Sequence, residues 1–352
     1  MDYKKELEEL VGLLLKEEAS DLHLSMGRNP IIRVASNLIP LVKEEVLTEA
    51  DIKGFMNVLL SPANKEMLEK EKNVDFSYGF TNARFRGNVY FHQGVHSIAL
   101  RLIPKTIRTL AELNLPPILE TFTRKKQGFF LAVGPIGQGK TTTLATMVEM
   151  INQTRAEHIL TIEDPIEFLF SSKKSIIDQR EVRIDTPDFS NALTAMFRQD
   201  IDVCMVGEMR DIITIGTAVT AAETGHLILS TLHTNNASQT VDRIIDSFSP
   251  GQQDQIRIQL AGSLSGIFSQ RLIPRISGGL IPAYELLINN TATSNLIRER
   301  RTHELNTVIE TSSQEGMIDM NRSLAELLRA GEISVESAYQ NSNNPKNLER
   351  ML

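Results

Sequence analysis

The chain has 352 residues, of which 41% are hydrophobic and 23% are charged, with 20 glycines and 13 prolines. This composition is typical of globular proteins and excludes a disordered, collagen-like or low-complexity chain. The formal net charge of −7 weakens the case for a nucleic-acid-binding protein. The single cysteine, Cys204, excludes a disulfide framework within the chain and a four-cysteine zinc site.

The N-terminal sequence is charged, and the chain has no long apolar segment. The opening residues, MDYKKELEEL, contain no apolar core of a signal peptide. No apolar run approaches the ~18 residues that a membrane-spanning helix needs. These observations predict a cytoplasmic protein, and the chain length predicts two domains.

The N-terminal part of the chain has the pattern of a small α+β domain. Short strands are expected at 21–25 and 31–34, and strands over 83–91 and 97–103 are expected to pair around a Gln-Gly turn. An amphipathic helix precedes them, because apolar side chains recur at helical spacing at Leu7, Leu10, Val11, Leu14 and Leu15.

Two further helices are predicted from their starting residues. Thr48 begins a T-x-x-D helix cap, and Ser61 and Pro62 are residue types typical of an N-cap and a first helical position. We therefore predict an N-terminal domain over residues 1–103.

Residues 104–117 contain three prolines and no clear period, so they are predicted to be a linker. The next domain, 118–352, is predicted to be α/β with a mostly parallel sheet and a mainly helical C-terminal third. The strands are expected to be buried on both faces, because their apolar runs lack polar alternation, at 129–133, 159–162, 203–206 and 227–229.

A phosphate-binding loop is predicted after the strand at 129–133. Residues 134–141, GPIGQGKT, fit the pattern G-x-x-x-x-G-K-[ST], and a helix is expected to follow. In such a loop the backbone N–H groups bind phosphate oxygens, the lysine reaches the β- and γ-phosphates, and the hydroxyl ligates Mg²⁺. The candidate nucleotide-binding residues are Gly134, Pro135, Ile136, Gly137, Gln138, Gly139, Lys140, Thr141 and Thr142.

Two glutamates follow apolar strands and are candidate catalytic residues. Glu163 comes directly after 159–162, and Glu208 comes two residues after 203–206. Both are expected at the sheet edge where doubly wound folds bind ligands. A carboxylate there can orient the attacking water or hold Mg²⁺ with Thr141, a metal role we assign to Glu208. Which glutamate is the base remains open at this stage.

The order and spacing of further motifs resemble the PilT family of secretion-type ATPases. Besides the phosphate loop, these are ASDLH at 19–23, TIEDPIE at 161–167, GEMRD at 207–211 and TGHLILSTLHTNN at 224–236. The resemblance implies a PAS-like N-terminal domain, followed by a RecA-like P-loop ATPase domain with a helical C-terminal region. It also implies a homohexameric ring in which hydrolysis of ATP, with Mg²⁺, powers type IV pilus retraction and twitching motility.

The same resemblance assigns roles to residues outside the phosphate loop. His226 and His233 match histidines that lie near the γ-phosphate or at a subunit boundary in such motors. Arg84, Arg86 and Arg101 lie in the segment of arginines that act on the nucleotide of a neighbouring subunit. Arg84 and Arg86 share strand parity, so their side chains are expected to face the same way.

The sequence departs from the family pattern in several places. NLIRE at 295–299 matches the core of a segment associated with retraction, but the residues before it differ. Ile201 stands where proline is common, and Ile136 and Gln138 stand where threonine and serine are common; none of these changes removes a ligand. The chain lacks the four-cysteine zinc module and the longer N-terminal region of assembly and type II secretion ATPases, which favours retraction.

The resemblance further implies a location at the pilus base, peripheral to the inner membrane. An inner-membrane platform protein is the expected partner, a paralogous ATPase is a second candidate, and nucleic acid is not expected. Two alternatives stay open, an accessory PilU-like ATPase and a non-motor nucleotide-binding regulator. A nucleic-acid translocase is disfavoured by the acidic balance of charge.

Overall fold

The structure is a computed structural model that describes residues 2–34, 37–80, 83–103 and 106–352. The chain divides into two compact units. The N-terminal unit contains residues 1–106 and 165–169, and the C-terminal unit contains residues 107–164 and 170–352. Of the predicted linker, residues 104–105 lie outside the described residues, whereas Leu110 and Leu115 are buried in the core of the C-terminal unit.

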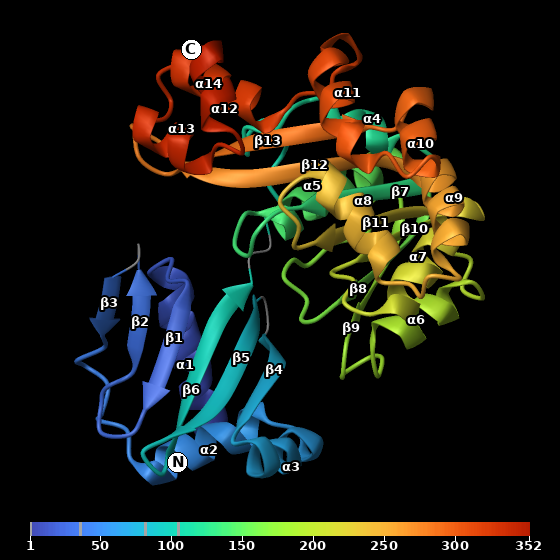
Figure 1. The fold of residues 1–352 in the computed structure, drawn as a ribbon. Helices are drawn as coiled ribbons and strands as arrows, with labels where there is room; N and C mark the ends of the chain where they lie inside the picture. Colours follow the sequence, from blue (N-terminus) through green and yellow to red (C-terminus); the bar gives the residue numbers. More distant parts are fainter. Residues whose placement is uncertain (1, 35–36, 81–82, 104–105) are drawn as a thin grey trace. The chain divides into compact units, whose positions relative to one another are not determined.

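The N-terminal unit is built on a six-stranded antiparallel sheet with the strand order β3-β2-β1-β6-β5-β4 (Figure 1). Its helices are α1 (Tyr3–Lys16), α2 (Glu49–Leu59) and α3 (Pro62–Glu71). Its strands are β1 (Asp21–Ser25), β2 (Ile31–Val34), β3 (Asn37–Pro40), β4 (Asn73–Phe80), β5 (Ala83–His92) and β6 (Val95–Ile103).

The predicted helices of this unit are confirmed, and so are four of its strands. The apolar face of α1 is buried against the sheet, except that Leu15 is 40% exposed. Thr48 and Asp51 form a reciprocal capping box at the start of α2, and Ser61 caps α3. The sequence analysis missed β3, which is short and exposed, and β4, although the apolar side chains of β4 alternate.

The C-terminal unit is built on a seven-stranded sheet with the strand order β13-β12-β7-β11-β10-β8-β9. Neighbouring strands are parallel except for β12 and β13. The strands are β7 (Gly128–Val133), β8 (His158–Glu163), β9 (Ile176–Glu181), β10 (Val203–Val206), β11 (Leu227–Leu232), β12 (Leu264–Pro274) and β13 (Leu280–Ile288).

The central strands are buried on both faces, as their apolar runs predict. Phe129 and Leu131 of β7 point into a core formed with α6 (Phe189–Met196), α7 (Ile212–Glu223), α8 (Ala237–Asp246) and α9 (Gln253–Ser263). Phe130 and Ala132 point the other way, toward α4 (Leu119–Thr123) and α5 (Lys140–Thr154). Cys204 of β10 is fully buried in the first of these cores, and burial raises the pKa of its thiol.

The prediction of a mainly helical C-terminal third overlooked a long antiparallel hairpin, β12–β13. Its strands mix glycine, proline and polar residues with apolar ones, so they lack the continuous runs that identified the other strands. Figure 1 shows the last helices packed along this hairpin, toward its turn. The helices after it are α10 (Thr291–Arg298), α11 (Leu305–Thr311), α12 (Met320–Arg329), α13 (Val335–Asn341) and α14 (Pro345–Met351).

Within the part of the chain that the structure describes, no helix combines the length and apolarity needed to cross a membrane.

Candidate nucleotide-binding site

The predicted phosphate loop connects the carboxyl end of β7 to the first turn of α5. Gly134 and Gly139 have φ angles of +142° and +78°, which side chains other than glycine rarely adopt. A Cβ atom on Gly134 would lie 2.4 Å from the backbone oxygen of Gln270. Glycine is therefore required at the start of the loop both by its backbone conformation and by its close contact with β12.

Lys140 is the first residue of α5, and its side chain is directed back into the loop. Its Nζ donates hydrogen bonds to the backbone oxygens of Gly134 (2.9 Å) and Pro135 (2.7 Å). The residue is only 7% exposed. The ammonium group is thus held beside the loop's own carbonyl groups, at the place where this motif positions phosphate.

His233 lies between Lys140 and Glu208. Its Nδ1 is 3.4 Å from Lys140 Nζ, and its Nε2 is 3.7 Å from a carboxylate oxygen of Glu208. Burial, and next the positive charge of Lys140, lower the pKa of His233, although Glu208 opposes this shift. The lowered pKa favours the neutral imidazole, which can act as donor on one nitrogen and acceptor on the other.

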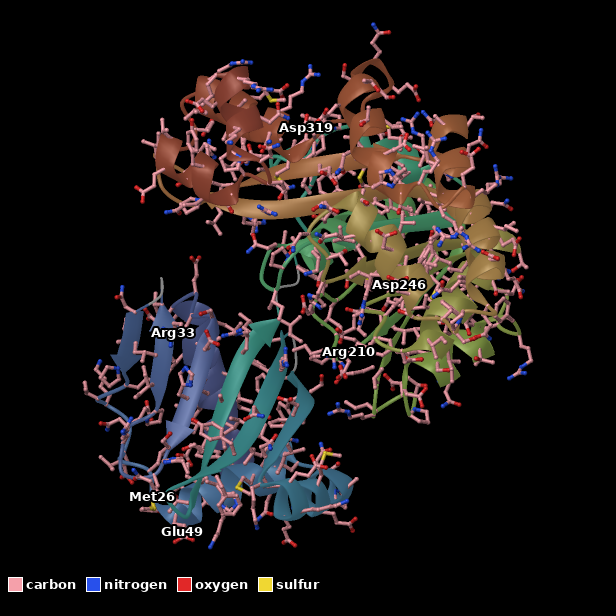
Figure 2. All side chains as sticks on the ribbon, viewed as in Figure 1. Met26, Arg33, Glu49, Arg210, Asp246 and Asp319 are labelled. Atoms are coloured by element: carbon pink, nitrogen blue, oxygen red, sulfur yellow. The ribbon has the colours of Figure 1, made fainter. Side chains whose placement is uncertain are left out.

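The two candidate glutamates lie at the carboxyl ends of adjacent strands and have different surroundings: Glu163 is the last residue of β8, and Glu208 comes two residues after β10. Glu208 pairs with the exposed Arg210 at 2.6 Å, and Figure 2 shows the Arg210 side chain at the protein surface. Glu163 is 2% exposed and accepts hydrogen bonds from Thr161 Oγ1 (2.6 Å) and Gln179 Nε2 (3.2 Å). Because β8 and β10 are parallel and in register, both carboxylates lie at the edge of the sheet that carries the phosphate loop.

His226 is not brought to this edge. It precedes β11, whereas His233 follows that strand, so the two are separated by about 20 Å of extended backbone. The His226 ring packs edge-on against Phe197, with its Nδ1 3.1 Å from the backbone oxygen of Ala221. The motif shared by the two histidines spans a whole strand, and for that reason its ends lie at opposite edges of the sheet.

The three candidate arginines lie on neighbouring strands of the N-terminal unit. Arg84 and Arg86 occupy alternate positions of β5, and Arg86 pairs in register with Arg101 of β6. Arg101 Nε donates to Asp21 of β1 at 2.8 Å, and Arg33 of β2 lies 3.8 Å from the same carboxylate. Arg84 and Arg86 lie on the same face of β5, opposite the buried Ala83 and Phe85. Arg86 belongs to a row of charged residues across the sheet with Arg101, Asp21 and Arg33.

Sequence reasoning missed the contribution of the β12–β13 hairpin. A cavity of about 350 Å³ lies beside the phosphate loop, and a nucleoside-sized ligand would need such a volume. The strands of the hairpin lack continuous apolar runs, so the sequence did not predict that its residues would lie beside the phosphate loop. Lining residues include Gly139, Thr142 and Thr143 from the loop and α5, and Gln270, Leu272 and Pro282 from the hairpin.

Comparison with known proteins gives consistent matches over nearly the whole chain. The family of type II/IV secretion system proteins matches residues 3–347. The chain is 41% identical to the type IV pilus retraction ATPase PilT of Pseudomonas aeruginosa over 348 residues, 97% of this chain and 99% of that protein. It is 34% identical to the type IV pilus ATPase PilU of the same organism over 349 residues, 99% of this chain and 91% of that one.

Among solved structures, the fold matches that of the pilus retraction motor PilT with bound ADP. The TM-score is 0.91 at 43% sequence identity, and the match covers 97% of this chain and 98% of that one.

Proposed function

Because this chain belongs to the type II/IV secretion system proteins, and within them to the PilT family of ATPases, we propose that it is an ATP-hydrolysing motor for type IV pilus retraction. It works as a homohexameric ring in the cytoplasm, at the inner-membrane base of the pilus. There it acts on a platform protein to withdraw pilin subunits, which produces twitching motility. Residues 1–103 form its PAS-like domain and 118–352 its ATPase domain.

The observation that carries the proposal is the row of Lys140, His233 and Glu208 beside the phosphate loop. Lys140 binds the β- and γ-phosphates in exchange for the two backbone oxygens that it now contacts. His233 then joins the phosphate-binding lysine to a carboxylate that can hold the metal or the attacking water. Loss of the γ-phosphate changes the hydrogen-bond partners of Lys140. His233 contacts Lys140 and lies in the loop after β11, so this loop moves in response.

The donor set at this edge of the sheet fits Mg²⁺. The hydroxyl of Thr141, in the first turn of α5, and the carboxylate of Glu208 are hard oxygen donors of the kind that Mg²⁺ prefers. Bound there with the nucleotide, the ion would neutralise charge on the β- and γ-phosphates. In this role Glu208 would exchange its contact with Arg210 for the metal.

The arginines of the N-terminal unit complete the proposed site from a neighbouring subunit. Arg84, Arg86 and Arg101 supply positive charge to the γ-phosphate bound by the next protomer. His226, which lies at the far end of β11, has no role at the phosphates in this proposal and is assigned to a subunit boundary.

An accessory, PilU-like ATPase is the second candidate. Identity to the PilU sequence is 34% against 41% to the PilT sequence, over similar lengths, which favours the principal motor. A paralogous ATPase in the same cell would be a partner under either reading. A non-motor regulator is disfavoured because Lys140, Thr141, Glu163 and Glu208 are all present.

The deciding experiment replaces the phosphate-loop lysine. Lys140→Ala is expected to abolish ATP hydrolysis by the purified protein, because no other side chain in the loop carries a positive charge. In the native host the same variant is expected to increase the number of surface pili and to stop twitching. The matched control, Lys126→Ala, removes an exposed lysine outside the site and is expected to behave as the wild type.

Two results would overturn the proposal. Full hydrolysis by Lys140→Ala would exclude the phosphate loop as the site of turnover. An unchanged pilus number in the host, with hydrolysis lost, would leave an ATPase but exclude a principal retraction motor.

A further inference from the structure

We propose that Gln138 and Gln270 are positioning residues, which fix the phosphate loop to strand β12 before nucleotide binds. Neither is a catalytic residue in this proposal, since the Gln138 side chain binds the backbone of β12 and the Gln270 side chain binds the Thr143 hydroxyl of α5. The inference rests on the proposed nucleotide-binding function and names the residues that determine its affinity.

Gln270 contacts both ends of the loop. It is 3% exposed, and its Oε1 accepts a hydrogen bond of 2.7 Å from the Thr143 hydroxyl, one turn into α5. Its backbone oxygen abuts Gly134 so closely that a Cβ there would come within 2.4 Å. Its Nε2 would lie 2.9 Å from a Cβ on Gly139. A single residue of β12 therefore restricts the conformation of the loop at Gly134 and at Gly139.

Gln138 attaches the middle of the loop to the same strand. Its Oε1 accepts a hydrogen bond of 2.6 Å from the backbone N–H of Leu272. Strand β7 ends at Val133, opposite Ser269, so Leu272 lies beyond the last pair between the two strands. Because β7 has already ended, no β7 residue pairs with Leu272, and the Gln138 oxygen binds the backbone N–H of Leu272 instead. A serine at position 138, with a side chain shorter by two bonds, would not span this distance.

Strand β12 is a firm support for these contacts. On one side it pairs with β7, and on the other it pairs with β13 over nine residue pairs. The neighbours of Gln270 are also bonded: Ser269 donates to the backbone oxygen of Asn235, and Arg271 donates to Asn341 and Asn343. A loop held against such a strand loses less conformational entropy when it binds phosphate, and it therefore binds more tightly.

The test uses glutamine-to-methionine substitutions, which keep the length of the side chain and remove its acceptor. Gln138→Met and Gln270→Met are each expected to raise KM for ATP and Kd for ADP by about 3- to 10-fold, the value of one neutral hydrogen bond. The rise in KM is expected to exceed any fall in kcat, because the substitutions weaken the support of the loop and leave Lys140 in place. Gln153→Met, on the exposed end of α5, is the control and is expected to match the wild type.

A double-mutant cycle tests whether Gln270 acts through α5. Thr143→Val removes the hydroxyl that donates to Gln270 and nearly keeps its shape. If the bond is the cause, Thr143→Val combined with Gln270→Met weakens ADP binding no more than the larger single effect. Additive effects would contradict the proposal for Gln270.

Pyrophosphate separates loop positioning from direct contact with the base or ribose. If the loop is disordered by the substitutions, pyrophosphate and ADP lose affinity by the same factor. Weakened ADP binding with unchanged pyrophosphate binding would overturn the proposal, and so would a loss of kcat at constant KM. If Gln270→Met does not fold, Gln138→Met decides the question, since Gln138 is only half-buried.

The proposed function and this inference fail in distinguishable ways. A wild-type protein that binds neither ADP nor pyrophosphate would contradict the nucleotide site itself. Normal binding by the wild type and by both glutamine variants would contradict only the positioning role.

Discussion

At the scale of single residues, Glu285 is a buried carboxylate that the sequence did not single out. It lies on β13, is 5% exposed, and accepts a hydrogen bond of 2.8 Å from the backbone N–H of Ala237 at the start of α8. Burial raises the pKa of Glu285 to about 7. The Ala237 N–H and Arg271 oppose the shift, and Asp319 at the N-cap of α12 adds to it (Figure 2).

Glu285 is expected to make stability depend on pH around neutrality. The folded state binds this proton more tightly than the unfolded chain does, so the contribution is full below the usual pKa of 4.5 and is lost as pH rises through about 7. Glu285→Gln keeps an acceptor for Ala237 and cannot ionise. The free energy of unfolding of Glu285→Gln, relative to that of the wild type, should therefore increase from acidic to alkaline pH by up to roughly 3 kcal/mol. The difference in Tm between the two proteins should increase in the same direction.

Thermal unfolding across this pH range measures the effect. The control is Glu336→Gln, which removes an exposed carboxylate of α13. Parallel pH profiles for Glu285→Gln and the wild type would show that Glu285 does not titrate with folding.

Residues of the candidate site were predictable to the extent that a short motif fixes their geometry. The phosphate-loop pattern specifies a strand, a turn and a helix, so it located Lys140 correctly within the fold. Strand parity gave the common orientation of Arg84 and Arg86. Gln270 could not be predicted, because a lone glutamine acquires its role only from the strands that bring it beside the loop.

At the scale of elements, continuous apolar runs predicted β7, β8, β10 and β11, because both faces of these strands are covered by helices. The β12–β13 hairpin has no such signal. One face of β12 holds the phosphate loop and the other holds the C-terminal helices through Arg271, so polar residues interrupt its pattern. The sequence pattern therefore predicted the strands that are buried on both faces, and it did not predict β12, which makes polar contacts on both faces.

Helices α12, α13 and α14 dock on this hairpin through a separate hydrophobic cluster. Leu324 of α12 is fully buried there with Ile273 of β12 and Ile281 of β13. Leu324→Ala is expected to destabilise this region by about 2–5 kcal/mol, from lost burial and the cavity left behind. Val335→Ala, at an exposed site on α13, is the control and should change stability by less than about 0.5 kcal/mol.

Hydrogen exchange of the backbone amides of α12 to α14 provides the measurement. Faster exchange confined to these helices is the expected result for Leu324→Ala. Equal exchange in Leu324→Ala and Val335→Ala would show that the cluster does not hold the helices in place.

At the scale of the whole molecule, the candidate residues are divided between two units of one chain, and no single-unit motif accounts for all of them. The order of five separate motifs gave the family, which no composition or periodicity could provide. The pairing of charged side chains was visible only in the fold: Arg86 lies beside Arg101, and Arg101 is bonded to Asp21.

Arginine replacement tests whether a neighbouring subunit completes the site. Arg86→Ala is expected to lower kcat for ATP hydrolysis by up to ~10³-fold without changing the oligomeric state. Turnover and sedimentation velocity are measured together, with Arg28→Ala as an exposed control in the same unit. Unchanged turnover at an unchanged oligomeric state would remove Arg86 from the site.

The buried position of Cys204 makes the native chain a convenient background for fluorescent labelling. It is the only cysteine, it lies in the middle of the central sheet, and burial keeps its thiol protonated and unreactive. Any cysteine introduced at the surface would therefore be the single site open to a maleimide dye. Pairs of dyes on separate protomers could then follow movements within the proposed ring without first replacing a native residue.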